Sequence, residues 1–313
     1  EPTDVMVDAI LDDLRGKDFD RIVAVGGGTV IDIAKVLTVA KSTDRVDDLY
    51  DRMANLEKEH ELIIVPTTCG TGSEVTNISI INRTTKGVKV GLVSPAMFAD
   101  EAALVPGMLL SLPYPVFATS SIDAMVHAVE SYLSPNACAL SELFSAKALH
   151  LILSCWKDAV AAGGKDAWKK HALEFLRASN YAGIAFGHAG CAAVHAMAYP
   201  LGGVHHIPHG QANQLMFADV MRKYQEKKPI GKLNQLEELL GAELDVEPVF
   251  SLENLYKLMD EVLKKDPLHE HGVTADELPV FAKNVIETQQ RLLGNNYVEL
   301  TEDDLLDIYR KAF

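Results

Sequence analysis

The stretch RIVAVGGGTVIDIAKVL, residues 21–37, decides the fold class of the first third of the chain. A run of β-branched residues leads into three glycines that begin at Gly26, and a helical pattern starts directly after Thr29. Such a strand, turn and helix form the repeating unit of a parallel sheet covered by helices. Glycines in this turn let backbone N–H groups approach a phosphate, and the helix N-terminus adds a partial positive charge. Ile31 occupies the place of the third glycine in the dinucleotide-binding fingerprint, so a plain tight turn is an equal alternative.

A second loop of the same kind is PTTCGTGSE, residues 66–74, which follows the apolar run LIIV. It is rich in hydroxyl groups and glycines. Two such loops at the carboxyl ends of parallel strands form the usual nucleotide site of an open α/β sheet. Together the two loops favour a nucleotide site over two simple turns.

The hydrophobic pattern changes near Pro106. Before it, β-branched runs alternate with helical stretches, which indicates buried parallel strands in βαβ units. The predicted helices are Asp4–Arg15 and Val30–Thr43, and the predicted strands and extended segments are Arg21–Val25, Glu61–Val65, Thr76–Asn82 and Val88–Val93. From Leu112 to Phe313 the pattern is almost wholly helical, with Thr301 capping the last helix. We therefore predict an α/β nucleotide-binding domain over residues 1–106 and a helical domain over residues 107–313.

Composition and charge exclude several classes of protein. The 313 residues are 48% hydrophobic and 23% charged, as in ordinary globular proteins, and no uncharged apolar run is long enough for a membrane span. A formal charge of −15 argues against a nucleic-acid partner, since phosphates are neutralised by clustered Lys and Arg. The four cysteines are widely spaced without a CxxC pair, and there is no secretion signal, so we expect reduced thiols in a cytoplasmic protein. The chain begins at Glu1 without a Met, and we expect residues in front of it.

The histidines and one carboxylate predict a metal site in two halves. Five of the eleven histidines fall between His188 and His209. Upstream, Asp123 and His127 lie four residues apart in an apolar helical pattern, so they share one helix face and would be costly to bury without a partner. One carboxylate with several imidazoles suits Fe(II) or Zn(II) rather than Ca or Mg.

The second half of the metal site is expected from His195 and His209. His195 lies in AAVHAMAYPLGG, residues 192–203, which we predict to be a helix broken by Pro200 and Gly202, and His209 lies in a predicted turn. The remaining histidines have a simpler interpretation, since a lone histidine is more often a packing or capping residue than a ligand. These are His60, His150, His171, His269 and His271, and His205 is also assigned to the surface or to packing.

Four motifs carry a resemblance to a known family: GGGTVIDIAK (26–35), PTTCGTGSEVTN (66–77), SSIDAMVHAVESYLSP (120–135) and VHAMAYPLGGVHHIPHGQAN (194–213). In this order they resemble the iron-dependent, or group III, alcohol dehydrogenases. The resemblance implies a Rossmann-like α/β domain followed by an all-helical metal-binding domain, the fold shared with dehydroquinate synthase. It also implies that a segment in front of Glu1 holds the first strand and helix of the family.

The resemblance assigns roles to individual residues. It implies four metal ligands, usually of Fe(II): Asp123, His127, His195 and His209. It implies an NAD cofactor whose diphosphate lies on Gly27, Gly28 and Thr29. The other residues assigned to the cofactor site are Asp32, Thr67, Thr68, Thr71, Ser73 and Lys89. Homodimers or larger homo-oligomers are typical of the family.

Several positions depart from the general family pattern. Tyr199 stands where many members have a second active-site histidine, His188 replaces a usual asparagine, and Asn295-Asn296-Tyr297 replaces Asn-Pro-Arg. Val105-Pro106 replaces Asp-Pro. These variants resemble the members that act on 4-hydroxybutyrate in fermenting anaerobes. NAD rather than NADP is taken from this resemblance.

The expected reaction is hydride transfer between NAD(H) and a small primary alcohol or aldehyde, with 4-hydroxybutyrate and succinate semialdehyde as the favoured pair. A metal ion would act as a Lewis acid on the substrate oxygen. Tyr199, His206 or water are candidates for the proton relay. The candidates for binding a substrate carboxylate are His188, Tyr199, Arg291 and Tyr297. The alternatives are an uncharged substrate such as butanol or 1,3-propanediol, a dehydroquinate synthase-like lyase, a metal-dependent hydrolase and a non-catalytic binding module.

Overall fold

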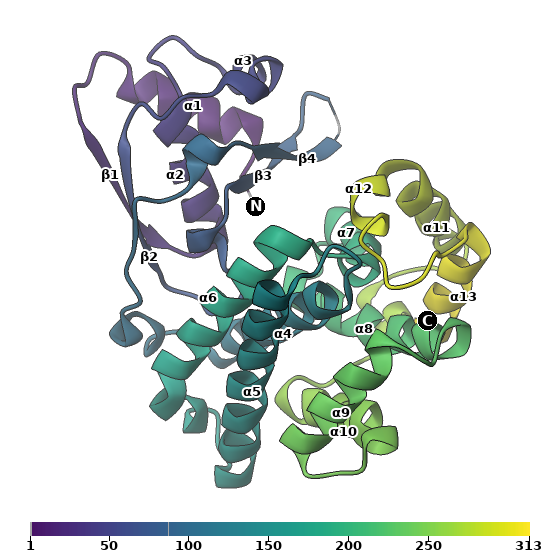
Figure 1. The fold of residues 1–313 in the computed structure, drawn as a ribbon. Coiled ribbons are helices and arrows are strands. Elements are labelled where there is room, and N and C mark those ends of the chain that lie inside the picture. Colours follow the sequence, from purple (N-terminus) through teal and green to yellow (C-terminus); the bar gives the residue numbers. More distant parts are fainter. Residues whose placement is uncertain (1, 87) are drawn as a thin grey trace.

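The computed structural model describes residues 2–86 and 88–313, and it consists of an α/β part followed by a helical part (Figure 1). The α/β part contains α1 (Asp4–Leu14), β1 (Arg21–Gly26), α2 (Gly28–Val39), α3 (Val46–Asp51), β2 (Glu61–Pro66), β3 (Ile78–Arg83), β4 (Val88–Val93) and β5 (Glu101–Ala102). A short 3-10 helix, η2 (Ser73–Val75), lies in the second glycine-rich loop.

The helical part begins with α4 (Tyr114–Leu133), α5 (Ala139–Ala162), α6 (Ala172–Ala189) and α7 (Ala193–His205). It continues with α8 (His209–Lys227), α9 (Lys232–Leu244), α10 (Pro248–Val262), α11 (Glu277–Thr288), α12 (Gln290–Leu293) and α13 (Glu302–Ala312). The predicted cap of the last helix is confirmed, because the Thr301 side chain accepts a hydrogen bond from the Asp304 backbone N–H. Among the described residues, no helix is long and apolar enough to cross a membrane.

Helix α2 is the centre of the α/β part. Strands β1, β2 and β5 form a parallel sheet in that order, with Arg21 opposite Glu61. On one face of α2, Ile31 and Ala34 pack against this sheet. On the other face, Val36 and Val39 pack against α1, α3 and the hairpin of β3 and β4. Two hydrophobic layers therefore hold the start of α2 at the carboxyl edge of the sheet.

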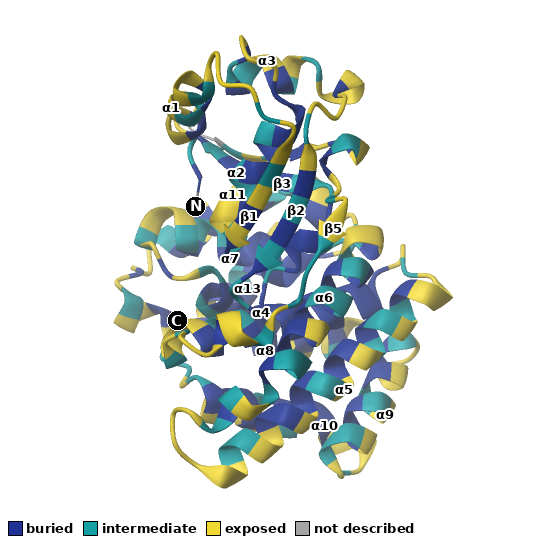
Figure 2. Cartoon of the chain, turned by 90° about the vertical axis from the view of Figure 1, so that its left-hand side faces the viewer, coloured by how far each residue is buried: buried dark blue, intermediate teal, exposed yellow. Residues whose placement is uncertain are grey.

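Two expectations for the strands are corrected. The segments around residues 78–83 and 88–93 do not join the parallel sheet, because they pair with each other as an antiparallel hairpin. Strand β1 is not buried on both faces, since it lies at the sheet edge and Val23 and Val25 are 58% and 50% exposed (Figure 2). Only the face of β1 that carries Ala24 is buried against α2.

The predicted helix over Val30–Thr43 is shifted towards the N-terminus. Gly27 adopts an extended conformation as the N-cap, so α2 already begins at Gly28. At its other end α2 stops at Val39, where the chain turns and the Asp44 carboxylate accepts a hydrogen bond from the Lys41 N–H at 2.7 Å. The consequence for function is that the free N–H groups of the helix start lie inside the glycine motif itself.

The expected break in the helix after His195 is wrong. Helix α7 continues through Pro200 and Gly202 to His205. A proline removes one helical hydrogen bond and weakens its surroundings. Here Pro200 provides no N–H for the Ala196 carbonyl, and the buried Tyr309 hydroxyl donates to the carbonyl of the next residue, Met197, at 2.7 Å. His209, expected in a turn, is the first residue of α8.

Helix α4 is the centre of the helical part. Every residue from Ser121 to Leu133 is buried, since α5, α6 and α8 surround this segment. A helix that is buried on all sides is normally apolar throughout. The two acids and the histidine inside it, Asp123, Glu130 and His127, must therefore find partners within the protein.

A buried lysine joins α2 to the second glycine-rich loop. Lys35 is completely buried, and its ammonium group donates to the Ser73 hydroxyl at 2.7 Å, the Thr76 hydroxyl at 2.9 Å and the Ile78 carbonyl at 2.9 Å. Burial lowers the pKa of Lys35 to about 8, although the nearby carboxylates of Asp32 and Glu74 oppose this shift. Three acceptors on one cation hold the loop close to the helix start.

We predict that Lys35→Met destabilises the protein by about 3 kcal/mol, because it leaves three buried acceptors without their donor. Urea unfolding measures this change. The matched control is Lys41→Met, an exposed lysine just beyond α2, which should alter stability by less than about 0.5 kcal/mol. Equal stability of the Lys35 variant and the wild type would contradict this role.

Candidate metal centre and cofactor cleft

Three electron-pair donors from three helices converge at one point. Asp123 lies on α4, His195 on α7 and His209 on α8, and their ligand atoms all lie within 4.8 Å of one another. Asp123 Oδ1 is 3.5 Å from both His195 Nε2 and His209 Nε2. Asp123 and His195 are buried, whereas the His209 side chain is 34% exposed. One side of the cluster is therefore open.

His127 joins the cluster through His195. The two rings stack with their centroids 4.5 Å apart, and the other face of His127 stacks on Phe186 at 4.2 Å. His127 Nδ1 lies 3.3 Å from the Gly70 carbonyl, which points the opposite nitrogen, Nε2, away from that loop. The structure thus brings together all four residues that the sequence singled out as metal ligands.

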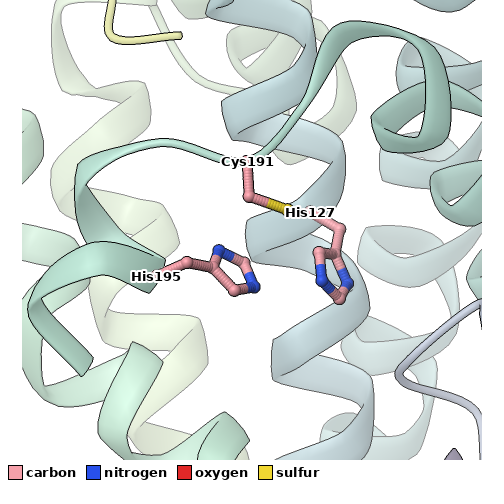
Figure 3. A group of neighbouring side chains, drawn as sticks. All are labelled: His127, Cys191 and His195. Atoms are coloured by element: carbon pink, nitrogen blue, oxygen red, sulfur yellow. The ribbon is translucent and has the colours of Figure 1, made fainter. Parts of the chain in front are cut away.

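Cys191 also lies beside the cluster, although the sequence analysis did not assign it there. Figure 3 shows Cys191, His127 and His195 converging from the α6–α7 connection, α4 and α7, and their ligand atoms lie within 4.8 Å of one another. Burial raises the pKa of the Cys191 thiol well above its ordinary value, and the carboxylates of Glu130 and Asp123 raise it further. A thiol is a poor ligand compared with a thiolate. The carboxylate and imidazoles are therefore the stronger donor set.

Glu130 orients His195. Its carboxylate is buried, and it lies 2.6 Å from His195 Nδ1. The same carboxylate accepts hydrogen bonds from the N–H groups of Ala192 at 2.9 Å and Val194 at 2.6 Å, at the start of α7. Because Nδ1 is bound to Glu130, Nε2 is the nitrogen of His195 that faces the cluster. Carboxylates in this position are typical partners of metal-binding histidines.

Asn213 lies in the middle of the cluster. Its Nδ2 donates to Asp123 Oδ1 at 2.8 Å and lies 3.2 Å from His195 Nε2 and 3.4 Å from His209 Nε2. Its Oδ1 is buried and accepts no hydrogen bond from any residue in the ranges 2–86 and 88–313. An uncompensated buried oxygen beside converging imidazoles and a carboxylate fits a divalent transition metal.

Gly210 allows α8 to approach α4 closely. A Cβ atom at this position would overlap the Thr119 carbonyl group. The N-terminus of α8 therefore packs directly on the α4 backbone, one turn before Asp123, and this contact places His209 in the cluster. A side chain at position 210 would push His209 away.

The electrostatics of the cluster depend on burial and on the two carboxylates. Burial by itself would lower the pKa of His195, but Glu130 and Asp123 outweigh it and raise that pKa to about 9. Burial lowers the pKa of His127 to about 3. For Asp123, burial alone would raise the pKa, and the surrounding imidazoles lower it below its ordinary value. A metal ion at His195 would therefore have to displace a proton.

The cluster lines a cavity of about 610 Å³ that also reaches the glycine-rich loops of the α/β part. The second loop packs directly on the helical part: Gly72 has a φ of +54°, and a Cβ there would lie 2.5 Å from the Gly183 Cα on α6. The Gly72 N–H also donates to the Ser179 hydroxyl at 3.2 Å. These contacts bring the two glycine-rich loops and the cluster into one cavity.

Most of the predicted cofactor-binding residues line this cavity. They are Gly28, Thr29, Asp32, Thr68, Thr71, Ser73 and Lys89. Gly27 and Thr67 are not among the lining residues. The Ser73 hydroxyl is already used within the protein, because it accepts from Lys35 and donates to Asp32 at 2.8 Å. Asp32 also accepts from the Ile80 N–H at 2.9 Å, so this pair stabilises the cleft in addition to any contact with a cofactor.

Two of the three predicted catalytic residues line the cavity, and the third does not. Tyr199 and His188 line the cavity, and Lys89 lies above the Tyr199 ring with its Nζ 4.9 Å from the centroid. His206 is exposed, has a φ of +55° at the end of α7 and is not among the lining residues. We therefore do not keep His206 as a proton-relay candidate. Of the other histidines, His205 pairs with Glu277 at 3.1 Å, in agreement with a packing role.

Sequence reasoning missed Glu130, Asn213 and Lys35. Each has a local signal, because it lies three or four residues from a residue that was singled out: Glu130 follows His127 by three, Asn213 follows His209 by four, and Lys35 follows Asp32 by three. These spacings place each pair on one helix face. Such a spacing alone does not distinguish a site residue from a solvated one.

We predict that Glu130→Gln weakens Zn(II) binding by about 10- to 100-fold, because the amide cannot accept all three hydrogen bonds and no longer orients His195. Competition with a chromophoric chelator measures the affinity. Glu57→Gln, which changes an exposed carboxylate in the loop before β2, serves as the control and should bind Zn(II) as the wild type does. Unchanged affinity in the Glu130 variant would rule out the orienting role.

We also predict that metal affinity rises with pH. His195 has a pKa of about 9 in the metal-free protein, and binding must displace its proton, so the affinity should rise roughly tenfold per pH unit between pH 7 and 9. Chelator competition across this range measures the slope, and calorimetry in two buffers counts the protons released. A flat profile, or no proton release at pH 7, would contradict the assignment of His195.

Comparison with known protein families covers both parts of the chain. Residues 1–106 match the family described as iron-containing alcohol dehydrogenase, and residues 117–313 match the family described as Fe-containing alcohol dehydrogenase family, C-terminal. Among curated proteins, 4-hydroxybutyrate dehydrogenase of Clostridium kluyveri is 46% identical over 313 residues, which is 100% of this chain and 84% of that protein.

Solved structures show the same fold. A 1,3-propanediol oxidoreductase aligns with a TM-score of 0.87 at 28% identity, over 100% of this chain and 82% of that one. Sulfoacetaldehyde reductase from Bifidobacterium kashiwanohense, solved in complex with NAD+, has a TM-score of 0.87 at 24% identity, over 99% of this chain and 81% of that one. The matches of both parts, together with the cluster and the cavity, show that the chain belongs to the iron-containing alcohol dehydrogenase family.

Proposed function

We propose that this protein is a metal-dependent oxidoreductase that transfers a hydride between NAD(H) and a small primary alcohol or aldehyde, with 4-hydroxybutyrate and succinate semialdehyde as its substrate pair. The observation that carries the proposal is a single cavity lined both by the glycine-rich loops and by Asp123, His195 and His209. The substrate pair is supported by the 46% identity with the clostridial 4-hydroxybutyrate dehydrogenase.

The α/β side of the cavity would hold the dinucleotide. The N–H groups at the start of α2, at Gly28 and Thr29, suit a diphosphate, because they have no partner within the helix. Thr68 and Thr71 add hydroxyl groups from the second loop. Lys35 holds this loop in place through its three hydrogen bonds.

Asp123, His127, His195 and His209 would hold Fe(II), the metal named for the family, and Zn(II) suits the same donors. When bound, the metal ion supplies a Lewis acid for the substrate oxygen, and NADH supplies the hydride. In the reducing direction the aldehyde carbon gains the hydride and its oxygen gains a proton. Glu130 maintains the orientation of His195 throughout, and the Tyr199 hydroxyl in the cavity is our candidate for passing the proton to the oxygen.

A neutral alcohol such as 1,3-propanediol is the second candidate substrate. It is supported by the likeness to a 1,3-propanediol oxidoreductase at 28% identity over the whole chain. We further propose a cytoplasmic homodimer or larger homo-oligomer, in line with the family resemblance and with four cysteines that form no disulfide in the described ranges.

The test is an anaerobic assay of the full-length protein reconstituted with Fe(II). We expect NADH oxidation with succinate semialdehyde, less with butyraldehyde and 3-hydroxypropionaldehyde, and less with NADPH in place of NADH. No oxidation with any of the three aldehydes would exclude the dehydrogenase function. A preference for a neutral aldehyde would favour the second candidate.

We predict that His209→Ala lowers both metal affinity and NADH oxidation by at least about 100-fold, because it removes one donor of the cluster. Metal content and initial rates are measured on the same preparation. His150→Ala is the control, since His150 lies on the surface of α5 beside Glu243, and both quantities should stay unchanged. Full activity of a His209 variant that has lost its metal would overturn the proposed mechanism.

A further inference from the structure

The described residues that line the cavity include one lysine and one arginine, Lys89 and Arg291. Lys89 lies on β4, above the Tyr199 ring, and its charge opposes the rise that burial causes in the pKa of Asp32. Arg291 lies on α12 in the helical part, and its charge acts on the Cys191 thiol beside the metal cluster. The two side chains thus reach the cavity from different parts of the chain, Lys89 from β4 and Arg291 from α12.

Arg291 is positioned by the turn that follows α12. The Asn295 side chain donates to the Cys191 carbonyl at 3.0 Å and accepts from the Asn136 amide at 2.7 Å. Gly190 makes this possible, since a Cβ atom there would overlap the Asn295 side chain. The turn is therefore fixed to the residue whose sulfur lies within 4.8 Å of ligand atoms of the cluster. Arg291, one helical turn before Asn295, lies on the wall next to the cluster.

The guanidinium group of Arg291 is available for a ligand. It forms no hydrogen bond or ion pair with any residue in the ranges 2–86 and 88–313. Asp32 and Asp123 are the carboxylates among the described lining residues, and both are bound to other groups, Asp32 to Ser73 and Asp123 to Asn213. A guanidinium binds a carboxylate through two parallel hydrogen bonds.

His188 lines the same cavity from the last turn of α6 and offers ring nitrogens as hydrogen-bond partners. Tyr297, the other residue that the sequence suggested for this role, is occupied elsewhere: its hydroxyl donates to the Ile230 carbonyl at 3.0 Å, and its ring lies in a separate surface pocket with Lys228. Because we assign the Tyr199 hydroxyl to proton transfer, Arg291 and His188 are the remaining candidates for binding the carboxylate.

We propose that Arg291 binds the substrate carboxylate, assisted by a hydrogen bond from His188, so that the cavity selects short ω-hydroxy acids and ω-oxo acids over neutral alcohols and aldehydes. This inference rests on the proposed dehydrogenase function and names the residues that decide its substrate class. The carboxylate lies at Arg291 while the reacting oxygen lies at the cluster, so the carbon chain between them spans the wall formed by Gly190 and Cys191.

The test compares Arg291→Gln and Arg291→Lys with the wild type, using succinate semialdehyde and its neutral counterpart butyraldehyde. Arg291→Gln should lower kcat/KM for succinate semialdehyde by about 10- to 100-fold. The same variant should keep kcat/KM for butyraldehyde within about twofold of the wild-type value. For Arg291→Lys, kcat/KM for succinate semialdehyde should lie between the values of the wild type and Arg291→Gln, because lysine keeps the charge and loses the paired hydrogen bonds. Arg310→Gln, at an exposed arginine on α13, is the control, and it should leave kcat/KM for both aldehydes unchanged.

Binding of butyrate, a carboxylate without a reacting oxygen, gives a readout that does not require turnover. Its affinity should fall in Arg291→Gln in parallel with kcat/KM, and His188→Asn should show a smaller fall. Equal losses for both aldehydes, or unchanged butyrate affinity, would overturn the role of Arg291. If the wild type does not oxidise NADH with any of the aldehydes, the proposed function fails. The butyrate measurement then still decides whether Arg291 binds a carboxylate.

Discussion

The buried carboxylate of Glu130 is the interaction on which the site depends. It lies at the centre of the helical part, where an isolated charge would be costly. Two N–H groups at the start of α7 and one nitrogen of His195 surround it. The same three contacts join α4 to α7 and direct His195 Nε2 towards Asp123. Stability of the helical core and geometry of the cluster are therefore supported by one side chain.

A comparable arrangement holds the cofactor side. Lys35 is buried in α2, and it connects the first glycine motif to the second through Ser73, Thr76 and Ile78. Gly72 then lets the second loop rest on the backbone of α6. Each half of the cavity is thus built around one buried charge whose partners come from another segment. These two buried charges hold the walls of the cavity in place, and glycine lets the walls come into close contact.

Local sequence patterns were sufficient for much of the fold. The start of α1, strands β1 and β2, the Thr301 cap and the helical character beyond residue 112 depend on periodicity and on residues a few positions apart, and they were predicted. The errors share a different cause. Helix α7 continues past Pro200 where the Tyr309 hydroxyl, 112 residues beyond Met197, binds the Met197 carbonyl. Strand β1 is half exposed because the face that carries Val23 and Val25 is left uncovered. Neither fact is present in the local sequence.

The sequence by itself determined which residues could form a metal site, because Asp123 and His127 share a helix face at a spacing that any helix imposes. It also predicted a nucleotide site at the two glycine-rich turns, because two such loops follow parallel strands and glycine lets backbone N–H groups approach a phosphate. Tertiary structure alone decided that Asn213 lies among the predicted ligands, that His206 lies outside the cavity and that Arg291 and His188 line it. These placements depend on how α6, α7, α8 and α12 pack around α4. Such packing depends on contacts between segments far apart in the chain, and no single local segment specifies it.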